Sequence, residues 1–275
     1  MNKIRPFLKW AGGKFELVEK IASLLPQDKK TLIEPFVGSG VVFLNTNYQH
    51  YILNDINCDL ITLYKILKDK PDTYIDDVKP FFSGKYNDEK KYYQLREKFN
   101  KSQDPYERSV LFLVLNRHCY NGLTRYNNSH QFNVPFGRYK SPYFPQEELY
   151  AFAEKSVRAR FTCQDFQKAM SQARSSSAFY CDPPYVPLSA SAKFTSYSAG
   201  GFNLTDQERL VEMAWKKTAS GVPVLISNHD TTYTKKIYKG TKREYLDVRR
   251  SISSKATERK RVREVLALFE PTNNS

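Results

Sequence analysis

The sequence predicts an α/β fold in which an open sheet is interrupted by a helical module. Three short apolar runs, at residues 31–36, 51–56 and 178–182, have the length of buried strands, and each closes on proline or aspartate. Helix-like segments separate them, which is typical of parallel strands. A long stretch in the middle of the chain is helical only. We therefore expect two domains, an α/β domain of residues 1–56 and 146–275 and an inserted helical domain of residues 57–145.

The first two predicted strands flank a glycine loop. After a helix at residues 15–25 come the strand at 31–36, then Val37-Gly38-Ser39-Gly40, and then a second helix. The loop lacks the third glycine of a dinucleotide fingerprint and the Gly-Lys-Ser/Thr of a phosphate loop. About twenty residues further on, Asp55 ends the next strand, where a carboxylate can accept hydrogen bonds from both hydroxyls of a ribose. The alternative is that Asp55 caps the helix that follows it.

The inserted segment ends in a polar stretch with the composition of a nucleic-acid contact. Residues 57–68 and 109–116 are predicted to be helices, the second more deeply buried. Residues 117–140 then combine asparagine, arginine and tyrosine with glycine. Asparagine and arginine can bind base edges through two hydrogen bonds, and tyrosine can wedge into a base stack. An ordinary long surface loop is the alternative.

The strand pattern resumes after the insertion. We expect a helix at 147–155, strands at 159–166 and 178–182, a helix that ends near Ser220 and starts with a capping box of Thr205 and Glu208, and strands at 222–228, 245–249 and 263–269. The last two strands have no helix between them. They are therefore expected to be antiparallel, because a parallel pair needs a crossover connection.

Residues 178–185, Ala-Phe-Tyr-Cys-Asp-Pro-Pro-Tyr, place hydrogen-bond acceptors at the end of a strand. Proline has no N–H, so Pro183 and Pro184 end the strand pairing and leave the Asp182 carboxylate and two carbonyls at the carboxyl edge of the sheet. Open α/β sheets bind ligands at that edge. With the flat ring of Tyr185, these acceptors suit a planar group that carries an NH₂, such as a nucleobase. A tight turn with a surface tyrosine is the alternative.

Two further segments are expected near this edge. Residues 187–202 are rich in serine and alanine and contain paired glycines, which predicts a mobile lid beside the site. The linker at residues 250–261 is expected to contact phosphates, although such charge runs are more often solvated loops. Its cations are Arg250, Lys255, Arg259, Lys260 and Arg261.

Charge and composition indicate a polyanionic partner. Lysine and arginine number 43 against 29 aspartates and glutamates, which gives a net charge of +14 and a pI near 9.4. Aromatic residues make up 14% of the chain. Cations interleaved with aromatic faces are suited to nucleic acid. An ordinary basic enzyme is the alternative.

The cysteines and the N-terminus predict a cytoplasmic protein. Cys58, Cys119, Cys163 and Cys181 are widely spaced, with no zinc-type pattern and no disulfide framework to infer. Cys163 and Cys181 lie in strand-like runs and are expected to be buried, reduced thiols. The first residues do not form a signal peptide, and no apolar run reaches membrane-spanning length.

Four features occur in the order known from one enzyme family. They are Phe7-Leu8-Lys9-Trp10-Ala11-Gly12-Gly13-Lys14, then Glu34-Pro35-Phe36-Val37-Gly38-Ser39-Gly40, then the insertion, then Asp182-Pro183-Pro184-Tyr185. Together they closely resemble the Dam family of DNA adenine-N6 methyltransferases, of the alpha class, over nearly the whole chain. The resemblance implies a Rossmann-like, seven-stranded mixed sheet that binds S-adenosylmethionine, with the insertion as target-recognition domain. It further implies base flipping in GATC of double-stranded DNA and no metal. The protein would belong to the bacterial cell or nucleoid, with a phage or prophage origin as the alternative, and would be monomeric in solution and able to bind DNA in more than one copy.

The resemblance also implies roles for individual residues. Asp182 and the Pro183 carbonyl would accept hydrogen bonds from the target N6 amino group, with Pro184 completing the motif and Tyr185 stacking on the flipped base. Asp55 would bind the ribose of the cofactor, and Asp165 with Phe166 its adenine. The full cofactor set would be Trp10, Lys14, Phe36, Gly38, Gly40, Asp55, Asp165, Phe166 and Asp182. DNA would be contacted by Lys9, Tyr120, Asn121, Leu123, Arg125, Pro135, Arg138 and Tyr139.

Two other functions are kept as alternatives. The first is a methyltransferase that acts on another amino group, such as cytosine N4 or an RNA base. The second is an inactive DNA-binding regulator that retains the fold. The intact Asp182, Asp55 and glycine loop argue against the second.

Overall fold

A computed structural model describes residues 3–188, 201–249 and 261–271. Within these residues lies a seven-stranded sheet of order β3-β2-β1-β4-β5-β7-β6. The strands are β1 (Thr31–Glu34), β2 (His50–Asp55), β3 (Ala159–Cys163), β4 (Ser177–Cys181), β5 (Val224–His229), β6 (Lys242–Arg249) and β7 (Arg261–Phe269). Strands β1 to β5 pair in parallel, whereas β7 runs antiparallel to β5 and β6. The predicted mixed sheet and its antiparallel last pair are confirmed.

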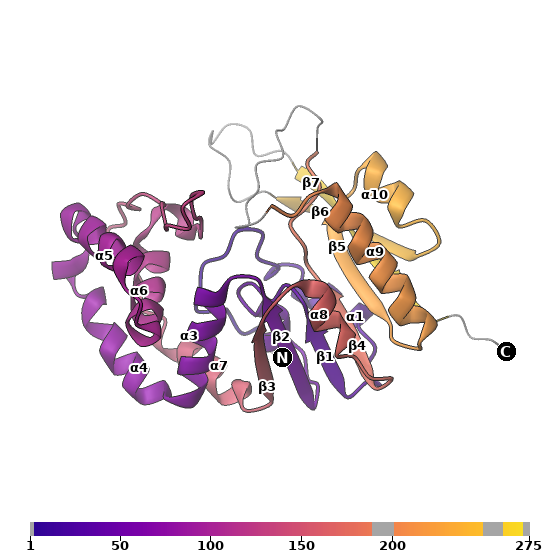
Figure 1. Ribbon diagram of the computed structural model, residues 1–275, viewed down its shortest axis with the longest axis horizontal. Helices are drawn as coiled ribbons and strands as arrows, with labels where there is room; N and C mark the ends of the chain where they lie inside the picture. The colour runs from indigo at the N-terminus through magenta and orange to yellow at the C-terminus, as the bar shows by residue number, and fades with distance from the viewer. Residues whose placement is uncertain (1–2, 189–200, 250–260, 272–275) are drawn as a thin grey trace.

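Helices cover both faces of the sheet (Figure 1). They are α1 (Val18–Leu24), α2 (Val41–Asn45), α3 (Cys58–Asp69), α4 (Pro71–Val78), α5 (Glu89–Lys101), α6 (Pro105–His118), α7 (Gln146–Ser156), α8 (Phe166–Ser171), α9 (Leu204–Ala219) and α10 (Thr232–Ile237). Three short 3₁₀ turns lie at Lys79–Phe82, Gly84–Tyr86 and Tyr120–Gly122.

Alternating side chains divide the core into two layers. In β1, Leu32 faces the layer formed by α1, α2, α3 and α7, whereas its neighbour Ile33 faces the layer of α8 and α9. Phe179 and Ile226 join Ile33 in the second layer. Because the central strands are buried on both faces, β4 is apolar from Ala178 to Cys181 and β5 from Val224 to Ile226. The polar residues that follow are thereby brought to the carboxyl edge of the sheet.

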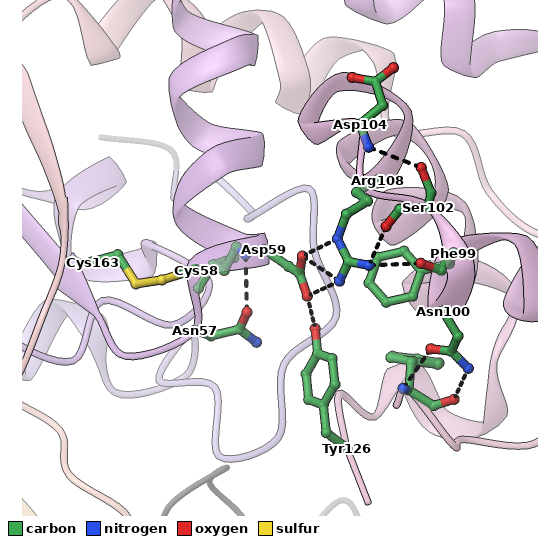
Figure 2. A network of polar contacts seen from close by, with 12 residues as sticks. Asn57, Cys58, Asp59, Phe99, Asn100, Ser102, Asp104, Arg108, Tyr126 and Cys163 are labelled. Atoms are coloured by element: carbon green, nitrogen blue, oxygen red, sulfur yellow. Dashed lines mark hydrogen bonds and ion pairs between the residues drawn. A yellow bond between two sulfur atoms is a disulfide. The ribbon is translucent and has the colours of Figure 1, made fainter. Parts of the chain in front are cut away.

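The helices of the insertion gather beside the β3 edge, away from α9 and α10 (Figure 1). Helix α6 is buried from residue 109 to residue 118, as its apolar sequence predicts. Its Arg108 binds Asp59 in the first turn of α3 through two nitrogens, at 2.8 and 2.9 Å (Figure 2). The Tyr126 hydroxyl donates to the same carboxylate at 2.7 Å. This charged, bidentate pair anchors α6 and the loop after it to α3.

The expectation of a reduced Cys163 is wrong. Cys58 and Cys163 form a disulfide with their Cα atoms 5.4 Å apart (Figure 2). Strands β2 and β3 are parallel neighbours in which Asp55 pairs with Cys163, so the start of α3 passes beside the end of β3. The two cysteines are 105 residues apart in the sequence. Their pairing depends on strand order, which residue spacing does not reveal. Cys119 and Cys181 are free and buried.

The predicted capping box is wrong by two residues. Asn203, not Thr205, caps α9, and it accepts a hydrogen bond from the Asp206 N–H at 3.1 Å. The Asp206 carboxylate accepts one in return from the Asn203 N–H at 3.0 Å. Asparagine and aspartate serve here as well as the threonine and glutamate of the expected motif. Most of the predicted lid, residues 189–200, and residues 250–260 of the basic linker lie outside the described residues.

Candidate active site and nucleic-acid interface

The glycine loop is fixed between the ends of β1 and β2. The Gly38 N–H donates to Asp55 Oδ2 at 3.1 Å, and the Gly38 carbonyl accepts from the Tyr64 hydroxyl at 2.5 Å. Gly38 has φ 47° and Gly40 has φ 71°, the left-handed region that glycine adopts without strain. A Cβ on Gly38 would lie 2.8 Å from the Trp10 indole nitrogen. The loop therefore forms a close-fitting cradle beside the indole.

Asp55 is a partly buried carboxylate at the carboxyl end of β2. Its Oδ1 accepts from the Asn57 N–H at 3.0 Å. Asn57, not Asp55, caps α3, since its side chain accepts from the Leu60 N–H. Burial raises the pKa of the Asp55 carboxyl, against the lowering effect of the N–H groups of Asn57 and Gly38. Next to it, the apolar side chain of Ile56 leaves 55% of its surface exposed, a feature that the sequence argument missed.

Aromatic rings line the loop from the side of α8. The ring of Phe36 is stacked on Phe166, with centroids 5.5 Å apart, and meets Phe202 edge-on at the same distance. Asp165 caps α8 by accepting from the Gln167 N–H at 2.9 Å, and it is exposed. A flat apolar wall with an acidic residue at its rim suits a nucleobase that presents an amino group.

Asp182 follows β4 and is held on both carboxylate oxygens. The Ser227 hydroxyl donates to Oδ1 at 2.6 Å, and the Lys14 ammonium lies 3.1 Å from Oδ2. Lys14 is buried and also donates to the Gly12 carbonyl at 2.5 Å. Among the described residues, no donor reaches the neighbouring Pro183 carbonyl. That carbonyl is therefore available as an acceptor next to the carboxylate.

Tyr185 turns a ring face toward the same ammonium. Lys14 Nζ lies 4.6 Å from the centroid of the Tyr185 ring. The Tyr185 hydroxyl donates to Glu264 Oε2 on β7 at 2.9 Å, and His229 meets the ring edge-on at 4.8 Å between centroids. These contacts fix the plane of the ring. The Lys14 ammonium thus lies between the Asp182 carboxylate and the face of the Tyr185 ring. The amino group of a base could occupy the same position.

Glu34 is a buried carboxyl at the end of β1, the strand next to β4, which Asp182 follows. It ends β1 with 2% of its surface exposed, and its Oε1 has no hydrogen-bond partner among the described residues. Burial, followed by the nearby Asp182 carboxylate, raises the pKa of Glu34 to about 8. The Lys155 ammonium opposes this rise. Glu34 therefore keeps its proton at neutral pH.

Two segments of the polar stretch lie side by side, joined by an isolated antiparallel bridge between Cys119 and Phe136. The Tyr120 N–H donates to the Pro135 carbonyl and the Gly137 N–H to the His118 carbonyl, each at 2.8 Å. Asn121 and Arg138 are exposed and have φ angles of 54° and 50°. Such positive φ angles mark a tight turn in each segment. The pairing brings together most of the predicted DNA contacts, namely Tyr120, Asn121, Leu123, Pro135, Arg138 and Tyr139.

Lys9 is locked against this surface by Asn116. The Asn116 amide accepts from the Lys9 N–H at 3.0 Å and donates to the Lys9 carbonyl at 2.8 Å and to the Gly122 carbonyl at 3.2 Å. The Lys9 ammonium lies 3.7 Å from the centre of the Tyr139 ring. Burial, followed by the charge of Arg117, lowers the pKa of Lys9. The N-terminal segment around Lys9 and the polar stretch of residues 117–140 therefore form one surface.

Arg125 is carried on an adjoining hairpin. Its Nε donates to Asn133 Oδ1 at 2.7 Å and its Nη2 to the Asn133 carbonyl at 3.3 Å. A bridge between Tyr126 and Phe132 closes the hairpin, and the Tyr126 hydroxyl ties it to Asp59 (Figure 2). The guanidinium is exposed and oriented, as a base-reading arginine must be.

Strand order explains which predicted residues meet. Strands β2, β1 and β4 are neighbours, so the glycine loop, Asp55 and Asp182 share one edge of the sheet. The sequence argument missed Ser227 and Glu264, which contact Asp182 and Tyr185. A signal for the first was present, because the apolar residues Val224 to Ile226 are followed by polar Ser227, Asn228 and His229 in the last half of β5. In the described part of the chain, no cluster of three metal-ligating side chains occurs and no helix has the length and apolarity to cross a membrane.

A sheet of this order, with an antiparallel β6–β7 pair, a glycine loop after β1 and acidic residues after β2 and β4, defines a class I methyltransferase. The chain belongs to the D12 class N6 adenine-specific DNA methyltransferases, whose family pattern matches residues 10–252. The predicted family is confirmed, and the alternatives of an inactive regulator and of another target amino group are set aside.

Curated relatives agree over almost the full length. The chain is 54% identical over 271 residues to a DNA adenine methylase of Salmonella typhi, covering 98% of this chain and 97% of the relative. Identity to the DNA adenine methylase of Escherichia coli K12 is 53% with the same coverage. A DNA adenine methylase of Vibrio cholerae is 50% identical over 273 residues, 98% of each chain. The chain is an S-adenosylmethionine-dependent DNA adenine-N6 methyltransferase.

Proposed function

We propose that this enzyme methylates N6 of the adenine in GATC of double-stranded DNA, as a monomer that extrudes the base from the helix. Residues 1–56 and 146–275 would form the catalytic domain, and residues 57–145 the target-recognition domain. The resemblance to the Dam family and the names of the relatives support the target. Helix α3 packs on β2 and β3 as well as on α6, so it joins the two domains.

The cradle around Gly38 fits the cofactor. S-adenosylmethionine supplies a methyl group activated by a positively charged sulfur. We assign Asp55 to its ribose hydroxyls, since this carboxylate lies at the strand end beside the glycine loop and is fixed by two N–H groups. Ile56 and the stacked Phe36 and Phe166 would enclose the adenine, with Asp165 at its amino group. Trp10 and Gly40 complete the wall of the cradle.

The observation that carries the catalytic assignment is the pair of acceptors beside Tyr185. An adenine amino group is a poor nucleophile because its lone pair is delocalised into the ring. Asp182 and the Pro183 carbonyl, by accepting its two N–H groups, would favour tetrahedral nitrogen and localise the lone pair for in-line attack. When bound, S-adenosylmethionine would supply its methyl group to this nitrogen, with the sulfur as leaving group. The nitrogen then releases one proton, which Asp182 is placed to accept.

Besides its expected contact with the cofactor, Lys14 has a second proposed role at the binding site of the target base. Its ammonium lies where the target amino group would bind, against Asp182 and over the ring of Tyr185. We infer that Lys14 balances the carboxylate until the base arrives and then moves aside toward the cofactor. Base extrusion costs a few kcal/mol, about what stacking on one aromatic ring returns.

DNA would be bound by the surface that Lys9 shares with the polar stretch. Arg125, oriented by Asn133, is the proposed base reader of the hairpin. The remaining contacts would come from Tyr120, Asn121, Leu123, Pro135, Arg138 and Tyr139.

Digestion of plasmid DNA tests the target directly. The enzyme, with cofactor, is incubated with unmethylated plasmid, which is then cut with a nuclease that needs N6-methyl GATC and with one that this mark blocks. We expect sensitivity to the first and resistance to the second. Methyl transfer that leaves both digestion patterns unchanged would contradict the assignment of GATC.

A further inference from the structure

The backbone after the catalytic carbonyl is held by side chains instead of strand pairing. Pro183 and Pro184 have no N–H group, so this turn lacks two of the donors that normally fix a peptide. At the two prolines themselves, only the carbonyl oxygens can form backbone hydrogen bonds. The Pro183 carbonyl is the one proposed to bind the target amine. The Pro184 carbonyl is therefore the group by which the protein can hold the turn.

Gln207 and Asn228 form hydrogen bonds with the backbone of the residues before and after Tyr185. Gln207, on α9, donates through Nε2 to the Pro184 carbonyl at 2.7 Å. Asn228, on β5, accepts at Oδ1 from the Val186 N–H at 3.0 Å. The peptide that carries Tyr185 is thus tied to a helix and to the neighbouring strand.

The two amides also bind each other inside the core. Asn228 Nδ2 donates to Gln207 Oε1 at 3.1 Å and to the Tyr238 hydroxyl oxygen at 3.0 Å. Gln207 and Tyr238 each expose 1% of their surface, and Asn228 exposes none. Burying polar side chains is unfavourable unless all their groups are paired. In this network, each side-chain nitrogen and oxygen atom of Gln207, Asn228 and Tyr238 has at least one hydrogen-bond partner.

The directions of donation allow one arrangement only. A carbonyl can only accept, so Gln207 must turn its NH₂ toward Pro184. Its oxygen then faces Asn228, which must present its own NH₂ and keep its oxygen for the Val186 N–H. Rotating either amide by half a turn would set donor against donor or acceptor against acceptor. The support is therefore rigid.

We propose that Gln207 and Asn228 are positioning residues for methyl transfer, which hold the peptide at residues 184–186 so that the Pro183 carbonyl and Asp182 face the same amino group. The inference rests on the catalytic role proposed for Asp182 and Pro183. Loss of the Gln207 donor is expected to lower kcat about a hundredfold, the usual cost of a misplacement of about 1 Å. Affinity for DNA and cofactor should stay the same, because both amides lie in the core.

Gln207→Glu gives a readout that a purely structural role would not produce. An ionised carboxylate cannot donate to the Pro184 carbonyl, but the protonated acid can. We expect kcat relative to the wild type to be low at pH 8 and to recover as the pH falls to 6. The control is Gln146→Glu in the first turn of α7, the same chemical change outside the network, which should follow the wild-type profile.

Gln207→Met removes the donor without introducing a charge, and it decides the question if Gln207→Glu does not fold. We expect a low kcat, an unchanged KM for DNA and no recovery at low pH. Wild-type kcat in Gln207→Met, or a Gln207→Glu profile parallel to the wild type, would overturn the positioning role. The wild type on the same GATC duplex tests the proposed function separately. An inactive wild type would overturn both, whereas active variants beside an active wild type overturn only the positioning role.

Discussion

The Lys14 ammonium lies 3.1 Å from the Asp182 carboxylate, the position proposed for the amino group of the target base. Replacing Lys14 by methionine removes this competitor. We expect Lys14→Met to extrude the target base more readily when no cofactor is bound, by about five- to thirtyfold, since a desolvated cation on a ring contributes about 1–2 kcal/mol. The fluorescence of 2-aminopurine at the target position measures extrusion. Unchanged or weaker fluorescence would show that Lys14 does not occupy the place of the base.

Arg125 is predicted to read one base of the target. Its guanidinium is oriented by Asn133 through two hydrogen bonds. Arg125→Ala should reduce discrimination at one position of GATC by about 1–3 kcal/mol. The measurement is kcat/KM on the cognate duplex and on duplexes changed at each position. Arg125→Lys keeps the positive charge but lacks the two parallel N–H donors of the guanidinium, so it should reduce discrimination at the same position. Equal weakening on all duplexes would mark a phosphate contact instead.

Glu34 is predicted to make stability depend on pH. Its folded pKa is about 8, against 4.5 for a free glutamate, so between these values unfolding releases its proton. The free energy of unfolding therefore falls as the pH rises, by at most about 1.4 kcal/mol per pH unit. Glu34→Gln cannot ionise and lacks this dependence. Urea unfolding at pH 6 and pH 7.5 should show the wild type losing stability relative to the variant. Parallel losses in both proteins would refute the assignment.

The disulfide between Cys58 and Cys163 is predicted to stabilise the fold. It links residues 105 positions apart, and bridges of this kind contribute about 2–4 kcal/mol. Adding a reductant should lower the free energy of unfolding by that amount. The double variant Cys58→Ser/Cys163→Ser should start at the lower value and not respond to reductant. A wild type equally stable with and without reductant would argue against the bridge.

The sequence was sufficient to predict the strands and to point to the glycine loop, Asp55 and Asp182, which the sheet brings to one edge. The runs before Asp55 and Asp182 are apolar because those strands are buried on both faces, and each stops abruptly where the sheet ends. The glycine loop was evident from Gly38 and Gly40, whose left-handed backbone requires glycine. These signals are local, since each depends on a few consecutive residues.

The partners of these residues could not be predicted, because they depend on strand order. Ser227 reaches Asp182 only because β5 lies next to β4. Glu264 reaches Tyr185 across 79 residues of sequence because β7 returns antiparallel to β5. The disulfide was missed for the same reason. No residue pattern reports which strands are neighbours, so contacts between strand ends have to be observed.

Asp182→Ala tests the central claim most directly. The variant removes the proposed acceptor of the target amino group and leaves the proposed DNA surface around Lys9 and Arg125 intact. Transfer of labelled methyl from S-adenosylmethionine to a GATC duplex is measured beside the Kd for the same duplex, with a melting curve to confirm folding. We predict that transfer falls by about a thousandfold or more, the scale of losing one oriented polar group in an active site, while the Kd is nearly unchanged. A variant that loses DNA binding and methyl transfer in equal measure would contradict the role of Asp182.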